Sequence, residues 1–299
     1  MEPIALRPLA FGEVLDTSFN LFKRNFKSAV VVSAVIMIPL TLLGAAASAG
    51  LAPTNLAALE DPNVTPEELL SVMGGFFGAL GVGALLQLLG SVLVQAATTR
   101  IYSENYRGIK VQPGDALRFG LTRLPAMIGL TLLSSIGTLV GTLFCIIPGV
   151  WLWAAWGLSP AALISEGAGP VRSLGRSFQL VKGAWWRVFG MLFVTTILVA
   201  IITSIVTSPL QIAVTFGSGF ASSPEAVFSS GYLAANTLIS GLATAITLPF
   251  TAAVVVALYF DQRVRKEGYD LERLIADLGD PPPSATTPTS DPTDPFGLG

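Results

Sequence analysis

The sequence predicts an all-α, polytopic membrane protein, a helical bundle of six transmembrane helices. Of its 299 residues, 52% are hydrophobic and only 12% are charged, about half the charged fraction of a soluble protein. The charges are also unevenly distributed, since several runs of about 20 residues contain none. A run of that length is long enough to cross the bilayer as a helix.

Six charge-free runs are the predicted spans. They cover residues 28–49, 72–99, 124–144, 150–164, 188–214 and 232–260. The stretch from Leu124 to Ser165 holds 42 residues without a charge, and as one helix it would run about 63 Å, about twice the thickness of the hydrocarbon core. It therefore has to fold back, and we expect the turn at Pro148-Gly149.

The 17 Lys and Arg residues predict the orientation of these spans. All of them lie in the N-terminal segment, in the loops after the second and fourth spans, and in the C-terminal segment. The connections 50–71, 145–149 and 215–231 contain none. The positive-inside rule then places both termini in the cytoplasm, and we expect a multi-pass protein of the bacterial cytoplasmic membrane.

The segment before the first span has two distinct faces when it is drawn as a helix over residues 10–27. The apolar face holds Phe11, Val14, Leu15, Ser18, Phe19, Leu21, Phe22 and Phe26, and the polar face holds Glu13, Asp16, Asn20, Lys23, Arg24 and Lys27. Such a helix either lies in the headgroup region or packs on the ends of the spans. The sequence leaves both interpretations open.

The same construction recurs along the chain. The segment LDTSFNLFK at 15–23 aligns with LGRSFQLVK at 174–182, and a weaker copy covers 113–123. We therefore interpret residues 1–279 as one membrane domain built from three units, each an amphipathic cytoplasmic helix followed by a two-span hairpin. Internal repeats occur in many transporter folds, but gene duplication without transport explains the pattern equally well.

No pattern of residues predicts catalysis. The chain has no histidine and one cysteine, which excludes imidazole bases, internal disulfides and thiolate metal cages. No ionisable residue lies inside a predicted span, which argues against an ion-coupled pump. We expect no enzyme, no catalytic, cofactor-binding or metal-binding residues, and no cofactor. The cytoplasmic acids Asp115, Glu166 and Asp261 are expected to form solvated ion pairs.

The sequence allows specific predictions for a few uncharged residues within the spans. Gln87, Gln95, Gln211 and Asn236 are expected to form hydrogen bonds between helices. The pairs Gly74-x3-Gly78 and Gly137-x3-Gly141 have the spacing of close helix packing. Trp156 is the one aromatic candidate for contact with a lipid or a substrate.

Three motifs resemble a known family. They are RPLAFGEVLDTSFNLFKRNF (7–26), EGAGPVRSLGRSFQLVKGAWWRV (166–188) and LYFDQRVRKEGYDLERL (258–274), and they are similar to actinobacterial integral membrane proteins described as resembling the membrane domain of glycerophosphoryl diester phosphodiesterase. The resemblance covers about residues 1–279. It implies a membrane module without the catalytic domain, and no functional residues carry over. Residues 280–299, rich in Pro, Ser and Thr, are expected to form a disordered cytoplasmic tail.

These features favour a non-enzymatic membrane protein that organises lipid or a partner protein at the cytoplasmic membrane. The expected partners are membrane lipids, with anionic headgroups facing the cytoplasmic basic residues. A protein partner is also open, and nucleic acid is not expected. The alternative function is a transporter or exporter of an amphipathic or lipidic solute, which a cavity reaching the middle of the bilayer would favour and a close-packed bundle would oppose.

Overall fold

The computed structural model describes residues 7–52, 63–217 and 228–268, so the expected tail at 280–299 lies outside the described residues. Within these ranges all regular secondary structure is helical, which confirms the all-α prediction. The helices are α1 (Phe11–Arg24), α2 (Phe26–Leu51), α3 (Pro66–Tyr106), α4 (Pro113–Phe144), α5 (Ile146–Trp156), α6 (Ser159–Glu166), α7 (Pro170–Val181), α8 (Trp185–Gly217) and α9 (Ser230–Glu267). Six stretches, with α5 and α6 counted together, are long and apolar enough to cross a membrane.

Local sequence signals explain where several helices begin and end. Thr65 caps α3, because its Oγ1 accepts a hydrogen bond from the backbone N–H of Glu68 at 3.3 Å while the Glu68 carboxylate accepts one from the Thr65 N–H. This reciprocal arrangement is a capping box. The α6 helix ends at Gly167, which has a φ of 64°, a conformation that glycine adopts without steric cost.

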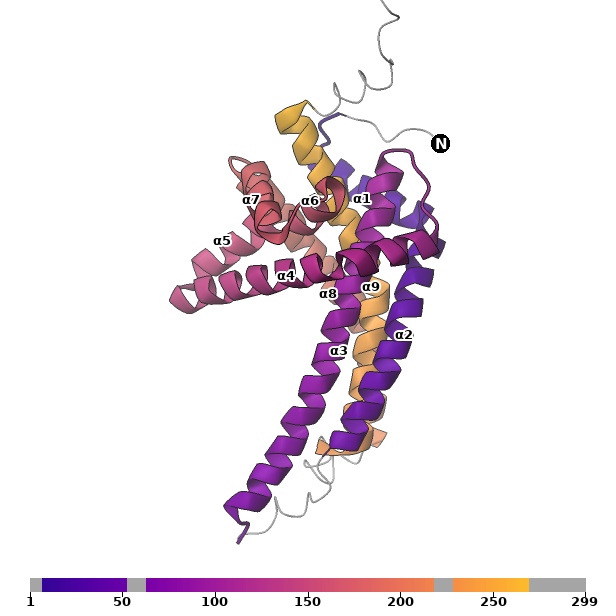
Figure 1. Ribbon diagram of the computed structural model, residues 1–299, viewed down its shortest axis with the longest axis vertical. Helices are drawn as coiled ribbons and strands as arrows, with labels where there is room; N and C mark the ends of the chain where they lie inside the picture. The colour runs from indigo at the N-terminus through magenta and orange to yellow at the C-terminus, as the bar shows by residue number, and fades with distance from the viewer. Residues whose placement is uncertain (1–6, 53–62, 218–227, 269–299) are drawn as a thin grey trace, which may run out of the picture.

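Three helices form what we call the stem: α2, α3 and α9 pack along one another and follow the long axis of the molecule (Figure 1). The α8 helix packs on α9. At one end of the stem lies what we call the cap, which consists of α1, α6 and α7 together with the adjoining ends of α3, α4 and α9. The α4–α5 hairpin crosses the stem instead of running along it, and it extends to one side below the cap (Figure 1).

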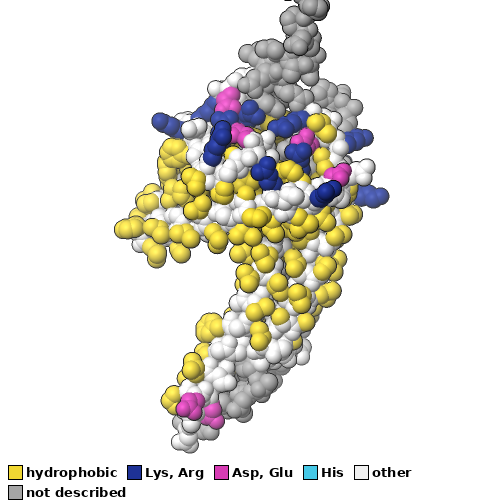
Figure 2. All heavy atoms as spheres, in the orientation of Figure 1, with side chains coloured by type: hydrophobic (Ala, Val, Ile, Leu, Met, Phe, Trp, Pro, Cys, Tyr) yellow, Lys and Arg dark blue, Asp and Glu magenta, His cyan; other side chains and the backbone are white. Residues whose placement is uncertain are grey.

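The two ends of the stem differ in the charged side chains that they carry. Figure 2 shows Lys and Arg side chains gathered over the cap, a broad hydrophobic surface over the stem and hairpin, and acidic side chains at the opposite tip. That tip is the first turn of α3, which carries Glu67 and Glu68. The segments that are basic in the sequence therefore come together at one end of the molecule.

The hairpin turns at a different residue from the predicted one. The turn is at Cys145, which is exposed and extended with φ −170° and ψ 148°, whereas Pro148 and Gly149 lie in the first turn of α5. Proline is tolerated there because the N–H it lacks would have no partner inside the helix. Gly149 instead serves helix packing, since a Cβ at this position would lie 2.9 Å from the Cα of Thr142 on α4.

The two glycine pairs behave differently. At Gly141 a Cβ would lie 3.0 Å from Leu152 Cδ1, and at Gly137 it would lie 2.5 Å from the indole of Trp156. This pair allows α4 and α5 to approach closely, as its spacing predicted. No described atom lies within 4 Å of the corresponding position at Gly74 or Gly78, so the same spacing on α3 does not mark a close contact between the described residues.

The region of the fourth predicted span contains two helices, α5 and α6, with a break at Gly157 and Leu158. A serine of α7 forms hydrogen bonds with the backbone at this break. The Leu158 N–H donates to Ser177 Oγ at 3.2 Å, and Ser177 Oγ donates to the Ala155 carbonyl at 2.7 Å. The buried hydroxyl of α7 therefore fixes the point at which the chain turns from the hairpin into the cap.

The repeat identified in the sequence has matching burial in the two copies. Ser18 of α1 and Ser177 of α7 are both 0% exposed, and the next residue in each copy, Phe19 or Phe178, is exposed at 57% or 37%. Both copies thus use the same face for packing. The third, weaker copy at 113–123 is continuous with α4 and does not form a separate helix.

The α1 helix shows features of both interpretations that the sequence left open. Its Val14 and Leu21 side chains are fully buried in the main hydrophobic core, and the helix packs on α9, whereas Phe19 remains largely exposed. The helix is therefore packed on the bundle through one part of its apolar face and presents an aromatic ring outward from the other part.

Replacing Leu21 with Asp is expected to lower the free energy of unfolding by about 3 kcal/mol, because it removes a buried side chain and places a charge in an apolar site. The midpoint of thermal unfolding in mild detergent measures this loss. Phe19→Asp, on the exposed part of the same face, is the matched control and should leave the midpoint nearly unchanged. Equal losses in the two variants would show that Phe19 also packs against the protein.

Candidate functional site

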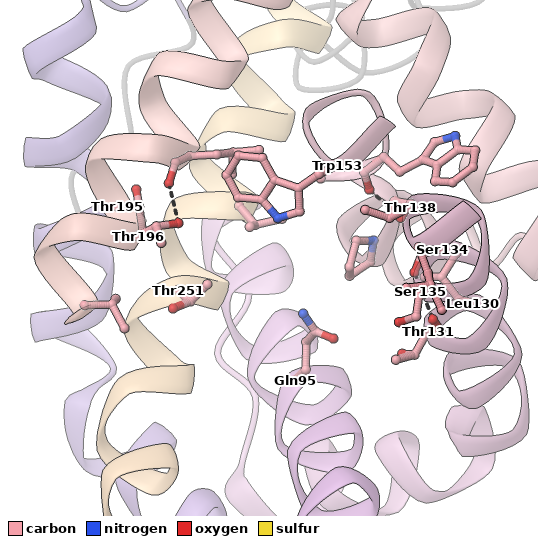
Figure 3. Close-up of a pocket in the computed structure, with 18 of the residues that line it drawn as sticks. Gln95, Leu130, Thr131, Ser134, Ser135, Thr138, Trp153, Thr195, Thr196 and Thr251 are labelled. Atoms are coloured by element: carbon pink, nitrogen blue, oxygen red, sulfur yellow. Dashed lines mark hydrogen bonds between the residues drawn. The ribbon is translucent and has the colours of Figure 1, made fainter. Parts of the chain in front are cut away.

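A cavity of about 730 Å³ lies between α3, α4, α5, α8 and α9 and the start of α6 (Figure 3). In this view α8 and α9 form one wall, α4 forms the opposite wall, and Gln95 of α3 lies between them. The polar residues that line it are Gln95, Thr131, Ser134, Ser135, Thr138, Thr142, Ser159, Thr195, Thr196 and Thr251. Apolar side chains, including Trp153, Trp156 and Leu192, complete the lining.

The hydroxyl groups of the lining differ in whether they already form a hydrogen bond. Seven of them donate to backbone carbonyls three or four residues earlier in the chain, at 2.6 to 3.2 Å: those of Thr131, Ser134, Thr142, Ser159, Thr195, Thr196 and Thr251. Such a bond uses the hydroxyl proton and leaves oxygen lone pairs that can accept. Within the described residues, the side chains of Gln95, Ser135 and Thr138 make no hydrogen bond.

Trp156 is the residue that the sequence singled out for a lipid or substrate contact, and it lies on the wall of this cavity. Its indole packs against Gly137 of α4, where a Cβ would come within 2.5 to 2.6 Å of the ring. The sequence identified Trp156 and Gly137 for unrelated reasons, and the structure brings them together. A larger residue at 137 would displace the indole and change the shape of the cavity.

The glutamines of α3 have different surroundings. Gln87 donates from Nε2 to Thr244 Oγ1 at 2.7 Å and to the Ser240 carbonyl at 3.3 Å, both on α9, which confirms the predicted bonding between helices. Gln95, two turns further along the same helix, lines the cavity instead. Scattered Ser and Thr residues on four different helices complete the polar wall, and no spacing along the chain marked them as a group.

Charged clusters fix the cap above the cavity. Asp261 of α9 has a fully buried side chain and accepts from the Leu9 N–H at 2.9 Å, from Arg187 at 3.0 Å and from Arg265 at 3.1 Å. Both arginines also donate to the Leu9 carbonyl. The expectation that Asp261 forms a solvated ion pair is therefore wrong, because the N-terminal segment covers it.

A second cluster joins α6, α7 and α9. Arg176 donates to Glu166 at 2.6 Å and to both carboxylate oxygens of Glu267, one of them at 2.7 Å. The hydroxyl of Tyr259 donates to Glu166 at 2.7 Å. The hydrogen bond with Glu267 raises the pKa of Arg176 above its ordinary value, so the guanidinium group of this link stays protonated. Asp115, by contrast, is exposed at the start of α4.

The clusters of the cap have the character of structural supports. Their carboxylates are satisfied by arginines and by backbone or hydroxyl donors. Across the part of the chain that the structure describes, no group of three or more His, Cys, Asp and Glu side chains is placed to hold a metal ion. The uncharged cavity can receive another molecule, because it offers hydrogen-bond acceptors beside apolar walls.

Apolar helices below a charged cap, with a polar cavity among them, define a multi-pass α-helical membrane protein. The chain is similar to the UPF0259 membrane protein plu2479 of Photorhabdus laumondii, with 23% identity over 189 residues, covering 58% of this chain and 72% of the relative. No protein-family model matches the chain, and no solved structure matches it.

These comparisons correct the family resemblance inferred from the sequence. No link to the membrane domain of glycerophosphoryl diester phosphodiesterase is found, so the interpretation of 7–26, 166–188 and 258–274 as motifs of that family is wrong. The structure gives a physical reason for the error. In the described residues, these segments contain α1, α7 and the end of α9, whose amphipathic pattern and basic residues serve cap packing. Membrane proteins of many families use such helices.

Proposed function

We propose that this chain is a non-enzymatic membrane protein that holds a lipid or another amphipathic molecule in the cavity below its cap. The observation that supports this proposal is a recess of about 730 Å³, lined by hydroxyl groups and apolar side chains, among helices that are long and apolar enough to cross a membrane. Its volume is within the range of small-molecule sites, roughly 300–1,000 Å³. A molecule with a polar head and an apolar body matches a wall made of hydroxyl groups and tryptophan rings.

We further propose that the cap faces the cytoplasm of a bacterial cell and lies at the headgroup level of the cytoplasmic membrane. The basic residues gathered on the cap support this orientation through the positive-inside rule. The exposed rings of Phe19, Phe26 and Trp186 support the depth, because aromatic side chains favour the interface. Anionic lipid headgroups are then the natural neighbours of the cap.

Transport or export of an amphipathic solute is the second candidate function, and the same cavity favours it. The cavity lies between the stem and the hairpin, and the hairpin crosses the stem instead of running along it (Figure 1). A change in the position of the hairpin relative to the stem would therefore alter access to the lining. Holding and transport differ in one measurable respect: in transport the bound molecule crosses the bilayer.

The proposal is tested by filling the cavity. Protein purified in mild detergent is expected to carry a lipid-sized adduct in native mass spectrometry. Ser134→Trp, on the cavity wall, should reduce that adduct about tenfold, since it occupies the space that the molecule needs. Ile136→Trp is the matched control, because Ile136 lies on the same helix, is exposed and does not line the cavity.

Two results would contradict the proposal: no adduct on the wild-type protein, or the same adduct on both tryptophan variants. Reconstituted vesicles separate the two functions. Protein-dependent passage of a labelled lipid that Ser134→Trp abolishes would support transport, and binding without passage would support holding.

A further inference from the structure

We infer that the molecule held in the cavity has an uncharged headgroup that bears one or more hydroxyl groups, as a diacylglycerol or a glycolipid has, and not a phosphate headgroup. This inference rests on the proposed function and narrows it to a class of ligand. It follows from the charge of the lining, from the direction of its hydrogen bonds and from the polar groups left without partners.

The first argument is charge. None of the residues that line the cavity is ionisable. A phosphate placed among apolar helices requires a cationic partner, because an isolated ion loses far more hydration energy than uncharged groups return. The arginines of the cap that the structure shows in ion clusters are already engaged: Arg187 and Arg265 with Asp261, and Arg176 with two glutamates.

The second argument is the direction of the hydrogen bonds. Seven lining hydroxyls already donate to backbone carbonyls of the helices, so what they offer to a ligand is mainly lone pairs. A phosphate diester or a carboxylate consists of acceptors only and meets no donors from these groups. A hydroxyl group of the ligand can donate to them.

The third argument is the set of polar groups without partners. Among the described residues, Gln95, Ser135 and Thr138 line the cavity and make no side-chain hydrogen bond. Each of them can both donate and accept, as a ligand hydroxyl can. Gln95 is on α3, and the other two are on α4 (Figure 3), so a single ligand hydroxyl can bond to one of these helices, and a headgroup with two hydroxyls can bond to both.

The test compares two lipids that have the same acyl chains and differ in the phosphate, dioleoylglycerol and dioleoyl phosphatidic acid. Each is added to the full-length protein in mild detergent, and retained lipid is measured by native mass spectrometry. The quantity of interest is the difference between wild type and Ser134→Trp, because phosphatidic acid bound to the basic cap is retained in both. We expect the cavity-specific retention of dioleoylglycerol to be about tenfold greater, since the lining offers a phosphate no cation and few hydrogen-bond donors.

A double variant tests the polar groups directly. Ser135→Ala with Thr138→Val keeps the shape of the wall and removes two hydroxyls, and it should reduce retention of dioleoylglycerol about tenfold at an unchanged unfolding midpoint. Thr247→Val is the control, because its hydroxyl donates to the Ala243 carbonyl on α9 and does not line the cavity.

The outcomes distinguish this inference from the proposed function. Cavity-specific retention of phosphatidic acid over dioleoylglycerol, or retention that the double variant leaves unchanged, would overturn the inference and leave the proposed function standing. Retention of neither lipid, with no effect of Ser134→Trp on any native adduct, would overturn both.

Discussion

Replacing Asp261 with leucine is expected to prevent most of the protein from reaching its native structure. The carboxylate is completely buried and accepts hydrogen bonds from Arg187, Arg265 and the N–H of Leu9. Without it, two guanidinium groups keep only the Leu9 carbonyl among these partners. Removing one partner of a buried ion cluster costs about 3–5 kcal/mol, against a total stability of about 5–15 kcal/mol.

The measurements are the monodisperse fraction in size-exclusion chromatography and the midpoint of thermal unfolding in mild detergent. Asp261→Asn should have an intermediate effect, because the amide oxygen can still accept while the charge is lost. Asp115→Leu is the control, since Asp115 is exposed at the start of α4, and it should resemble the wild type. A monodisperse Asp261→Leu protein with the wild-type midpoint would show that the cluster does not hold the N-terminal segment in place.

The six candidate spans could be predicted from the sequence because a membrane span is a local property. A charge-free run of sufficient length marks it whatever the rest of the chain does. The packing face of α1 was predicted in part from helical periodicity, since Val14, Ser18 and Leu21 of its predicted apolar face are buried while Phe19 of the same face is exposed. The break between α5 and α6 depends instead on a contact between Ser177 and a backbone 19 residues earlier.

The charge clusters could not be predicted, because their members are far apart along the chain. Asp261 bonds to Leu9 across 252 residues and to Arg187 across 74. When the sequence around one such residue is considered by itself, the predicted environment of a charged side chain next to a span is solvent. Whether a carboxylate beside a span is buried depends on which segment covers it, and neither composition nor periodicity contains that information.

The candidate site was accessible from the sequence only in part. Trp156 was identified because it is a deep aromatic residue, and Gly137 because of its spacing, but their contact requires the register between α4 and α5. The Ser and Thr residues of the cavity looked like ordinary packing residues, because hydroxyls in spans usually bond to their own helix or to a neighbouring one. Most of these do bond to their own helix, and it is the arrangement of six helices that turns them toward one space.

Replacing Gly149 with leucine is expected to separate the two helices of the hairpin. A Cβ at this position would lie 2.0 Å from Thr142 Oγ1 and 2.9 Å from Thr142 Cα. Rotation of the threonine side chain can relieve the first contact but not the second, because Cα is part of the backbone. The α4 and α5 helices must therefore move apart, at a cost of about 1–3 kcal/mol for an overpacked site.

The same displacement should affect the cavity, because Thr138 and Thr142 form part of its α4 wall. We expect a lower midpoint of thermal unfolding together with loss of the retained lipid. Gly81→Leu on α3 is the matched control, since no described atom lies within 4 Å of that position. If Gly149→Leu keeps both the midpoint and the lipid, the hairpin does not define the cavity. If it keeps the midpoint but loses the lipid, the hairpin shapes the site without adding to the stability of the stem, and the expected cost of overpacking is wrong.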